Sequence, residues 1–467
     1  MNEFSGAHVW AHKEFGEASL GDKRRTPRLV NIAGQLAASP AGRITAVFRV
    51  PADRTATYRF LENQAIAPAA IAEASHEAAA HRCWGMPFVF APTDQTDLCL
   101  TDCQGVKGLG GVGTHGTKAR GLQVVSTIVV SPDGTPLGLS GMAIWPRHVG
   151  KKKSAHARRR QRTEDKETQQ WLDSMRQSIA AMKQAGIRTR LWFQLDRGGD
   201  GWPIFREPLG DAYLTVRSSW DRRLVTPSGP GQRYLREFVR SQEPAGDYLL
   251  DVPAGKNRTA RVATMRVRAC EVTLDLWDRR TNQHHPTTLW AVSTEEISAV
   301  PRGEERIAWL LLTTYPVHSI DDVYQVIFGY AQRWKIETFH NSWKTGACNV
   351  EQTQLRKLDH ILRWLMITAA VAMRIQRLTH LARNEPDLPA TVELTQAEID
   401  AAIVVTKQKK HRRGDVPTIA QAVLWIAQAG GYTGKSSGGP PGARVVARGL
   451  DRIDALARYF SDEAGKK

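Results

Sequence analysis

A polar stripe between residues 330 and 344 combines side-chain types that bind metal ions and phosphates. If this segment is helical, at about 100° per residue the stripe spans roughly 80° of the helix, and the opposite side is apolar. One carboxylate beside arginine, lysine and tyrosine is expected where a metal ion meets phosphate oxygens. The alternative is an amphipathic helix whose polar side faces water and carries a surface ion pair. The stripe consists of Tyr330, Arg333, Glu337, Asn341 and Lys344.

Glu337 needs further acids if it is to hold metal ions for phosphoryl transfer. Mg²⁺ prefers carboxylate oxygens, and a site with two such ions needs several acids from distant elements. Asp94 follows the apolar segment FVFAPT and Asp196 follows LWFQL, so each stands where a strand end can face a cleft. A single aspartate in such a place is more often a turn or a helix cap. The three acids together, on three such elements, favour a metal-dependent phosphoryl-transfer site.

Apolar periodicity predicts the elements that must position these acids. From about residue 220 to 305, β-rich segments follow a Pro/Gly stretch and no convincing helix is found, which predicts an antiparallel β-subdomain inserted into an α/β domain. We expect strands at PFVFAP before Asp94 and at 122–130, 136–145, 190–196, 212–218 and 306–314. We expect helices at 163–185, 320–345 and 355–383, and shorter helices in the first 80 residues.

The composition indicates a globular and basic chain. Its 467 residues include 64 Lys+Arg against 47 Asp+Glu, a formal charge of +17, which favours nucleic acid as the partner over an ordinary basic enzyme. An apolar fraction of 42% excludes a disordered chain. We expect no membrane span, because no uncharged apolar run of about 18 residues is found, and no secretion signal. The five sparse cysteines are typical of reduced thiols, and we expect a cytoplasmic, nucleoid-associated protein.

The polar stripe resembles the signature of the insertion-sequence-four family of transposases. Tyr330, Arg333, Glu337 and Lys344 reproduce its Y-x2-R-x3-E-x6-K pattern. The resemblance covers nearly the whole chain and includes LGDKRRTPRLVNIAGQLA, TYRFLEN, DQTDL, LDR, VRS, WLLLT, RWKIETFHNSWKTGA and AQAGGY. The sequence departs from the best-known member at Asn341, where that protein has a lysine, at Ala38 and Ser39, which replace a Lys-Tyr pair, and over 226–260, which aligns poorly.

This resemblance implies an RNase H-like catalytic domain whose acids Asp94, Asp196 and Glu337 hold two Mg²⁺ ions, with Mn²⁺ able to substitute. Members of this family bind the terminal inverted repeats of double-stranded DNA as homodimers and nick the DNA with a metal-activated water. They excise the element through a hairpin and join its 3′ ends to target DNA. Each step is an in-line displacement at phosphorus, so one metal-containing pocket serves all of them. The expected function is therefore that of a cut-and-paste DNA transposase.

The resemblance also assigns roles to cationic and aromatic side chains. Tyr330, Arg333 and Lys344 would grip phosphates beside the scissile bond, with Arg217 as a further basic contact. Trp309 would stack on a flipped base; the alternative is a core aromatic on its strand. In the end-binding module, surface arginines that only face solvent are the alternative, and Arg59 is the expected direct contact. The matching positions of that module are Arg24, Arg25, Arg28 and Arg59.

We therefore expect three domains. Residues 1–80 would form a helical DNA-binding domain, 81–385 the catalytic domain with its β-rich insertion at about 220–305, and 386–467 a helical dimerisation region. The basic run 147–166 would be a solvated loop or an unspecific phosphate patch. Two other functions stay open: a catalytically silent DNA-binding relative that regulates or inhibits transposition, and an RNase H-like nuclease without strand transfer.

Overall fold

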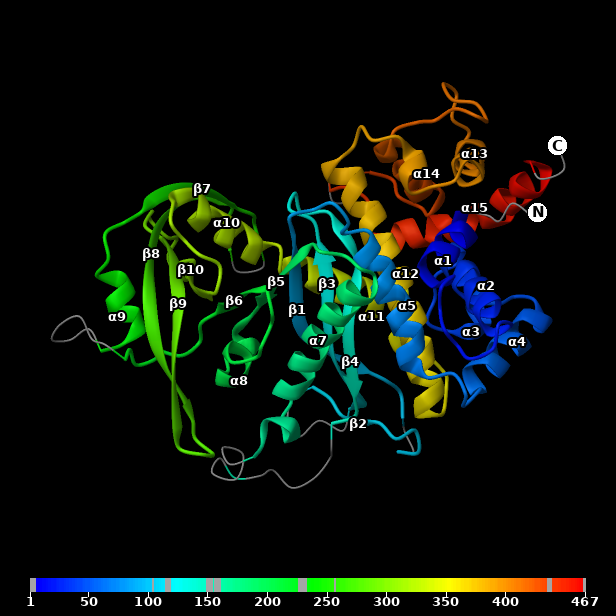
Figure 1. Ribbon diagram of the computed structural model, residues 1–467. Coiled ribbons are helices and arrows are strands. Elements are labelled where there is room, and N and C mark those ends of the chain that lie inside the picture. The colour runs from blue at the N-terminus through cyan, green and yellow to red at the C-terminus, as the bar shows by residue number, and fades with distance from the viewer. Residues whose placement is uncertain are drawn as a thin grey trace.

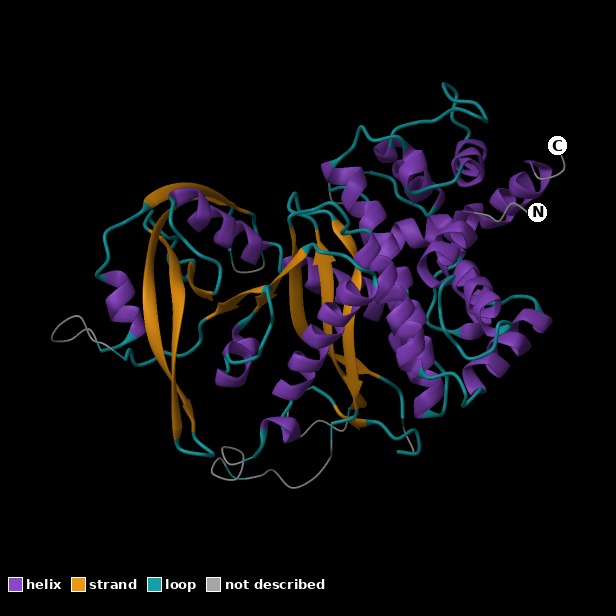
Figure 2. Cartoon of the chain, viewed as in Figure 1, coloured by secondary structure: helices purple, strands orange, loops and turns teal. Residues whose placement is uncertain are grey.

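A ten-stranded mixed sheet runs through the computed structural model, with helices packed around it (Figure 1, Figure 2). The structure describes residues 6–102, 105–113, 119–147, 154, 161–225, 233–255, 258–434 and 439–464. The strand order is β2-β3-β1-β5-β6-β10-β9-β8-β7, with β4 paired to β3. The strands are β1 (Phe88–Cys99), β2 (Gly110–Gly111), β3 (Arg120–Val130), β4 (Pro136–Trp145), β5 (Arg190–Leu195), β6 (Tyr213–Arg217), β7 (Gly246–Val252), β8 (Arg261–Asp278), β9 (Gln283–Glu296) and β10 (Ala308–Thr313).

Helices make up the N- and C-terminal regions and cover the sheet between them. The N-terminal helices are α1 (Gly6–Phe15), α2 (Arg25–Ala38), α3 (Ile44–Val47), α4 (Pro51–Glu62) and α5 (Pro68–His81). The central ones are α7 (Thr168–Gln184), α8 (Trp202–Phe205), α9 (Leu235–Arg240), α10 (Ile320–Ala331), α11 (Trp334–Lys344) and α12 (Leu358–Asn384). The C-terminal ones are α13 (Gln396–Val405), α14 (Ile419–Ala429) and α15 (Ala443–Ala464), and the four short 3₁₀ helices are η1 (Thr163–Asp165), η2 (Arg197–Gly199), η3 (Val350–Gln352) and η4 (Ala390–Val392).

The strands at the centre of the sheet are apolar on both faces because helices cover both sides. On β1 and β5, Phe90 and Trp192 belong to the core shared with α10, α11 and α12. Their neighbours Val89 and Leu191 point to the other face, into the core shared with α7. The sequences of such strands are continuous apolar runs, as expected where helices cover both faces of a sheet. The α/β class predicted from the sequence is confirmed.

The inserted β-region continues the same sheet at one edge. Strands β7, β8 and β9 join through β10, which pairs antiparallel with both β6 and β9. The expectation of no helix in this region was wrong, because α9 lies between β6 and β7. Its Leu235 and Val239 are buried in the core shared with β8. These two apolar positions are four residues apart, which is one helical turn, but six residues are too short a pattern to detect.

The helix expected over 320–345 is divided. α10 ends at Ala331 and α11 begins at Trp334. Around the junction the backbone bonds tighten to three-residue spacing: the Arg333 N–H donates to the Tyr330 carbonyl and the Ile336 N–H to the Arg333 carbonyl. The prediction of one continuous helix was therefore wrong. Since both junction residues keep right-handed helical angles, hydrophobic periodicity does not reveal this local tightening.

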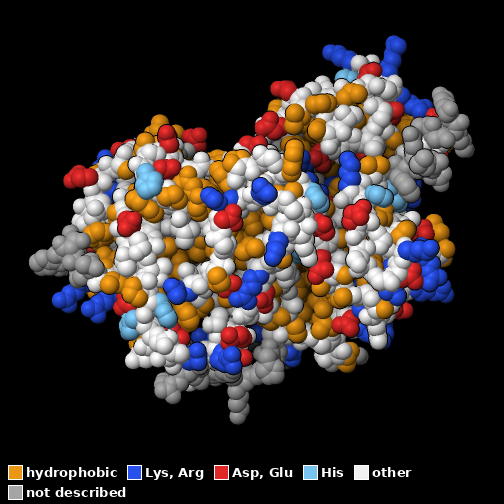
Figure 3. All heavy atoms as spheres, viewed as in Figure 1, with side chains coloured by type: hydrophobic (Ala, Val, Ile, Leu, Met, Phe, Trp, Pro, Cys, Tyr) orange, Lys and Arg blue, Asp and Glu red, His pale blue; other side chains and the backbone are white. Residues whose placement is uncertain are grey.

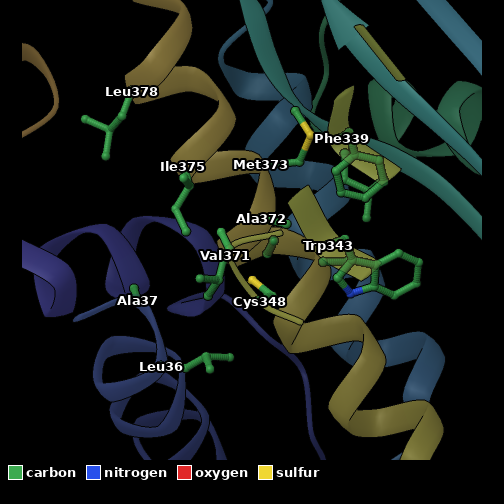
Figure 4. Close-up of a cluster of buried hydrophobic side chains, with 14 of the residues drawn as sticks. Leu36, Ala37, Phe339, Trp343, Cys348, Val371, Ala372, Met373, Ile375 and Leu378 are labelled. Atoms are coloured by element: carbon green, nitrogen blue, oxygen red, sulfur yellow. The ribbon is translucent and has the colours of Figure 1, made fainter. Parts of the chain in front are cut away.

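α12 is the central support of the helical regions. This 27-residue helix is buried along most of its length. The Trp343 indole N–H of α11 donates to the Thr368 hydroxyl of α12 at 2.9 Å, and the Arg363 guanidinium donates to the carbonyls of Ile66 and Leu61 at 2.6 and 2.9 Å. Within the described residues, no helix is long and apolar enough to cross a membrane. Figure 4 shows side chains of α2, α11 and α12 in one cluster: Leu36, Ala37, Phe339, Trp343, Val371 and Ile375.

A buried ion pair joins α12 to the C-terminal helices. Arg374 donates to Glu398 at 2.9 Å, and the two side chains are only 1% and 6% exposed. Arg374 also donates to the Ala37 carbonyl of α2 at 3.3 Å, and its guanidinium lies 5.7 Å from the ring centre of Trp10. One buried arginine therefore holds three helical segments that are far apart in sequence.

We predict that Arg374→Met lowers the free energy of unfolding by about 3–5 kcal/mol, because the carboxylate of Glu398 is left buried without its cation. The matched control is Asp22→Ala, which breaks the exposed Arg24–Asp22 pair and should change stability by less than about 1 kcal/mol. Urea unfolding followed by tryptophan fluorescence measures both. Equal, small losses in the two variants would contradict a structural role for the buried pair.

Candidate functional site

Asp94 and Asp196 lie side by side because their strands are parallel neighbours. The register of β1 and β5 pairs Thr93 with Leu195, so the following residue of each chain segment is one of the two aspartates. Asp94 lies inside β1, which continues to Cys99, and the expectation that the strand ends before it was wrong. Asp196 directly follows β5 and caps the 3₁₀ turn η2, accepting a bond from the Gly198 N–H at 2.7 Å.

Glu337 is joined to Asp94 through Arg333. The Arg333 guanidinium donates to a carboxylate oxygen of Asp94 at 2.7 Å and to one of Glu337 at 2.6 Å. Arg333 and Asp94 have side chains only 14% exposed, whereas that of Glu337 is 35% exposed. Burial alone would lower the pKa of Arg333, but Asp94 and then Glu337 outweigh it and raise the pKa above its ordinary value. The arginine is therefore a fixed positive charge between two carboxylates.

Asp94 is largely buried and lies close to two other acids. Burial, and then the nearby charge of Asp196, raise its pKa from 3.8 to about 7, with a smaller contribution from Glu337. Arg333 and the Gln95 N–H act in the opposite direction. Desolvation and like charges both disfavour a carboxylate, so this group gains from an added cation. Perturbed acids of this kind are typical of functional sites.

The donor set fits a hard divalent cation in its chemistry. Three carboxylates supply oxygen ligands of the type that Mg²⁺ prefers, and Asp94 feels the charges of both other acids. Among the residues that the structure describes, no group of three or more Asp, Glu, His or Cys side chains is already arranged to hold an ion. The contacts of Arg333 account for this, because its guanidinium lies between Asp94 and Glu337.

Tyr330, Arg217 and Trp309 form the side of the site toward β10. The Trp309 ring meets the Tyr330 ring edge-to-face at 5.1 Å. Burial raises the pKa of Tyr330, and the charges of Arg333 and Arg217 oppose that rise, which places both cations near the phenol. Arg217 donates to the Ala308 carbonyl at 3.2 Å. Trp309 is half-buried and packs against the core, so it contacts the core and is still partly exposed.

Lys344 lies at the other end of α11. Its ammonium donates to the Thr96 hydroxyl of β1 at 3.2 Å and lies 4.0 Å from Glu351. Thr96 is two residues beyond Asp94 on the same strand, so Lys344 and Arg333 approach β1 on either side of Glu337. Asn341 is exposed. The whole predicted set, Asp94, Asp196, Tyr330, Arg333, Glu337, Lys344, Arg217 and Trp309, thus belongs to one region of the structure.

His340 behind the site was not predicted from the sequence. It is 5% exposed, and its Nε2 lies 3.3 Å from the Ser126 hydroxyl on β3. Ser126 is the cross-strand partner of Asp94, so this contact fixes α11 against the strand beside the acid. Burial and then the charges of Lys344 and Arg333 lower the pKa of His340 to about 3. A histidine three residues after Glu337 gives no periodicity signal, because it stands at the border of the apolar side.

The four N-terminal arginines line one surface pocket of about 680 Å³ between α2 and α4. Arg24 pairs with Asp22 at 2.9 Å, and Arg25 donates to the Leu20 and Ala65 carbonyls at 2.6 and 3.3 Å. Arg28 and Arg59 are exposed, and neither side chain has a hydrogen bond or ion pair with the described part of the chain. Figure 3 shows Lys and Arg side chains at the edge of the molecule formed by these helices. These cations are therefore available to an anionic partner.

Most of the basic run 147–166 lies outside the described residues, so its prediction as a phosphate patch is not tested. At its edges, Arg147 pairs with Glu167, and Arg162 pairs with Glu164 at 3.1 Å. Both of these arginines already have a carboxylate partner.

Comparison with protein families gives three matches along the chain. Residues 7–66 match the family described as Transposase DNA-binding, 147–374 the Transposase DDE domain, and 370–462 the Transposase Tn5 dimerisation domain. The DDE match contains Asp196 and Glu337 and begins after Asp94. The three matches follow one another along the chain, and the matched DDE domain is of the RNase H-like type. The chain therefore belongs to the DDE transposases of the insertion-sequence-four family that resemble the transposase of Tn5.

Proposed function

We propose that this DNA transposase cuts and joins DNA at the acids Asp94, Asp196 and Glu337. The observation that carries the proposal is the meeting of three carboxylates from β1, the end of β5 and α11, with Arg333 bonded to two of them. The substrates would be terminal inverted repeats and target DNA. We propose residues 1–80, 81–385 and 386–467 as the end-binding, catalytic and dimerisation domains, with a homodimer holding two ends.

The acids would hold two Mg²⁺ ions, with Mn²⁺ able to substitute. When bound, such ions activate the attacking oxygen and stabilise the leaving oxygen of an in-line displacement. The chain's own part is to bring hard oxygen ligands together and keep them aligned. The β1–β5 ladder fixes the two aspartates, while the bond from Trp343 to Thr368 and the contact of His340 with Ser126 hold the helix of Glu337.

Arg333, Lys344 and Tyr330 would hold the scissile phosphate. In the DNA-free chain the fork of Arg333 is engaged by Asp94 and Glu337. Phosphate oxygens accept bidentate bonds from a guanidinium as carboxylates do, so a phosphate could replace the acids as the partner of Arg333. Lys344 beyond Glu337, and Arg217 beside Tyr330, extend this cationic rim along the DNA backbone.

The hairpin step of excision would use Trp309. A base that leaves the helical stack can be held against an aromatic ring, and such stacking contributes about 1–3 kcal/mol. Trp309 presents a half-buried ring next to Tyr330, so the ring is supported by its neighbours and is still partly exposed. Trp309 is connected to the acids through its neighbours: its ring contacts Tyr330, and Tyr330 lies next to Arg333, which bonds to the acids.

Two other functions predict different products. A catalytically silent relative could dispense with the acids, yet all three are present and share one region. A nuclease that cuts without strand transfer would have no use for matched DNA-binding and dimerisation domains. Incubation of the protein with Mg²⁺, a precut transposon end and a plasmid separates the three. Joined products support the transposase mechanism, whereas cutting alone or no reaction would contradict it.

We predict that Glu337→Gln reduces cleavage below detection while DNA binding persists, because the carboxylate is assigned to metal ions and not to DNA. Cleavage is followed on gels, and binding by mobility shift, with DNA selected by the protein from a random pool. The matched control is Glu305→Gln, which makes the same substitution at an exposed residue on the loop before β10. This variant should cleave DNA normally. Loss of binding in Glu337→Gln would contradict the assignment.

We predict that Trp309→Ala slows hairpin formation about 5- to 150-fold more than first-strand nicking, the range that corresponds to about 1–3 kcal/mol of stacking. Nicked and hairpin products are separated on denaturing gels over time. Trp84, which is 79% exposed, provides the control: Trp84→Ala should change neither step. Equal losses of nicking and hairpin formation in Trp309→Ala would assign Trp309 to the core alone.

We predict that Arg59→Ala weakens binding of selected DNA by roughly tenfold without loss of stability, because the loss of a charge-assisted contact costs about 1–3 kcal/mol. Arg25→Ala should instead lower the melting temperature, since Arg25 bonds two backbone carbonyls. Fluorescence anisotropy and thermal unfolding of both variants make the comparison. If the Arg59→Ala variant bound DNA with unchanged affinity, Arg59 would be a solvent-exposed residue without a DNA contact.

A further inference from the structure

The tip of the β8–β9 hairpin carries a layered aromatic and cationic surface outside the acid site. The hairpin pairs Trp277 with His284 across its strands. Their rings stack at 5.7 Å with an interplanar angle of 7°, and the Arg279 guanidinium lies 5.0 Å from the ring centre of Trp277. Trp277 is 42% exposed. In Figure 3, histidine and basic side chains gather toward this end of the hairpin.

The turn at the tip is held by its own hydrogen bonds. Asp278 is 5% exposed and accepts bonds from the Arg280 N–H at 2.9 Å and the Thr281 hydroxyl at 2.8 Å. The Trp277 indole N–H donates to the Asn282 side chain at 3.2 Å, and Asn282 has a left-handed φ of 61°. Asparagine tolerates that conformation better than most residues. The tip is thus preorganised, which reduces the entropy lost when it binds a partner.

The tip lies beside the segments that adjoin the acids. The Trp202 ring of α8, six residues after Asp196, stacks on His285 at 5.7 Å. On the other side, the Glu164 N–H and then the charges of Arg162 and Arg280 hold the pKa of Glu164 below its ordinary value. Glu164 precedes α7, whose Trp171 indole donates to Gln95, the neighbour of Asp94, at 3.3 Å. The hairpin therefore contacts α8, which follows Asp196, and its tip lies near the segment that precedes α7; we call this edge of the molecule the rim.

Cationic and acidic side chains both lie at this rim, and two of its arginines are exposed. The tip and its neighbour contribute Arg162, Arg279 and Arg280, and the 3₁₀ turn η1 contributes the exposed Asp165 and Glu164, which is paired with Arg162. The remaining acids of the tip are engaged locally: Asp275 pairs with His284 at 2.8 Å, and Asp278 caps the turn. Arg279 and Arg280 are exposed, and neither side chain has an ion pair within 4.0 Å in the described part of the chain.

We propose that the β8–β9 tip is a second DNA-binding surface, on which Arg279 and Arg280 contact phosphates of the duplex that enters the acid site. The Trp277 ring offers the Arg279 guanidinium a cation–π contact and also stacks on His284, so the two rings and the cation form one group at the tip. The contact is independent of sequence, since phosphates carry no base identity. The proposal rests on the assignment of the acids as the place where DNA is cut.

The experiment removes both charges and measures the salt dependence of DNA binding. In the Glu337→Gln background, R279A/R280A should lower the slope of log K against log salt by about 2, since each lost phosphate contact removes about 0.9 from the slope. The probe is a duplex selected by the protein from a random pool and extended by non-specific sequence across the cut. The matched control is R236A/R240A, two exposed arginines on α9 of the same insertion, which should leave the slope unchanged.

Hydroxyl-radical footprinting then locates the contact. R279A/R280A should lose protection at phosphates beside the cut while the end-binding footprint stays intact, and W277A should show a weaker form of the same loss. An unchanged slope, an equal change in the α9 control, or loss of protection only far from the cut would overturn the proposal. The assignment of the acids is tested separately. If the Glu337→Gln variant still cleaved DNA, that assignment would be wrong, but the salt dependence of DNA binding would still test the role of the tip.

Discussion

The crowding of Asp94, Asp196 and Glu337 is the interaction on which the rest of the structure depends. Bringing like charges together and burying one of them costs free energy, which the raised pKa of Asp94 reflects. Arg333 offsets part of that cost by bonding to two of the acids. The remaining cost is offset by rigid elements, because a parallel ladder holds the two aspartates and the contacts of His340 and Trp343 hold the helix of Glu337, so the carboxylates cannot move apart.

The helix that fixes Glu337 is itself held by α12, and α12 also carries the terminal regions. The bond from Trp343 to Thr368 sets α11 on α12, while Arg363 and Arg374 tie the same helix to the N-terminal helices. Arg374 further joins α12 to the C-terminal region through Glu398. The DNA-binding region, the acids and the dimerisation region therefore share one buried support, so that destabilising α12 disturbs all three at once.

Much of this arrangement could be predicted from the sequence, because the strands that hold the acids are long apolar runs. Strands were expected directly before Asp94 and Asp196, and the signature spacing around Glu337 pointed to a shared site; the parallel pairing of the two strands is seen in the structure. The short helix α9, the tightened turn at Arg333 and the contact of His340 with Ser126 were not predicted. These features depend on tertiary packing and hydrogen bonds between distant residues, which leave no local period in the sequence.

The positive charge of the chain is divided between two kinds of arginine. Arg28 and Arg59 at the N-terminal pocket, and Arg279 and Arg280 at the hairpin tip, are exposed, so in the proposed mechanism they would attract DNA before any chemistry begins. Arg333 differs because the acids already hold both arms of its fork. A cation bound by those acids would release the guanidinium to a phosphate. On this proposal, cation and DNA would favour each other's binding at the acids, whereas the exposed arginines would bind DNA regardless of the cation.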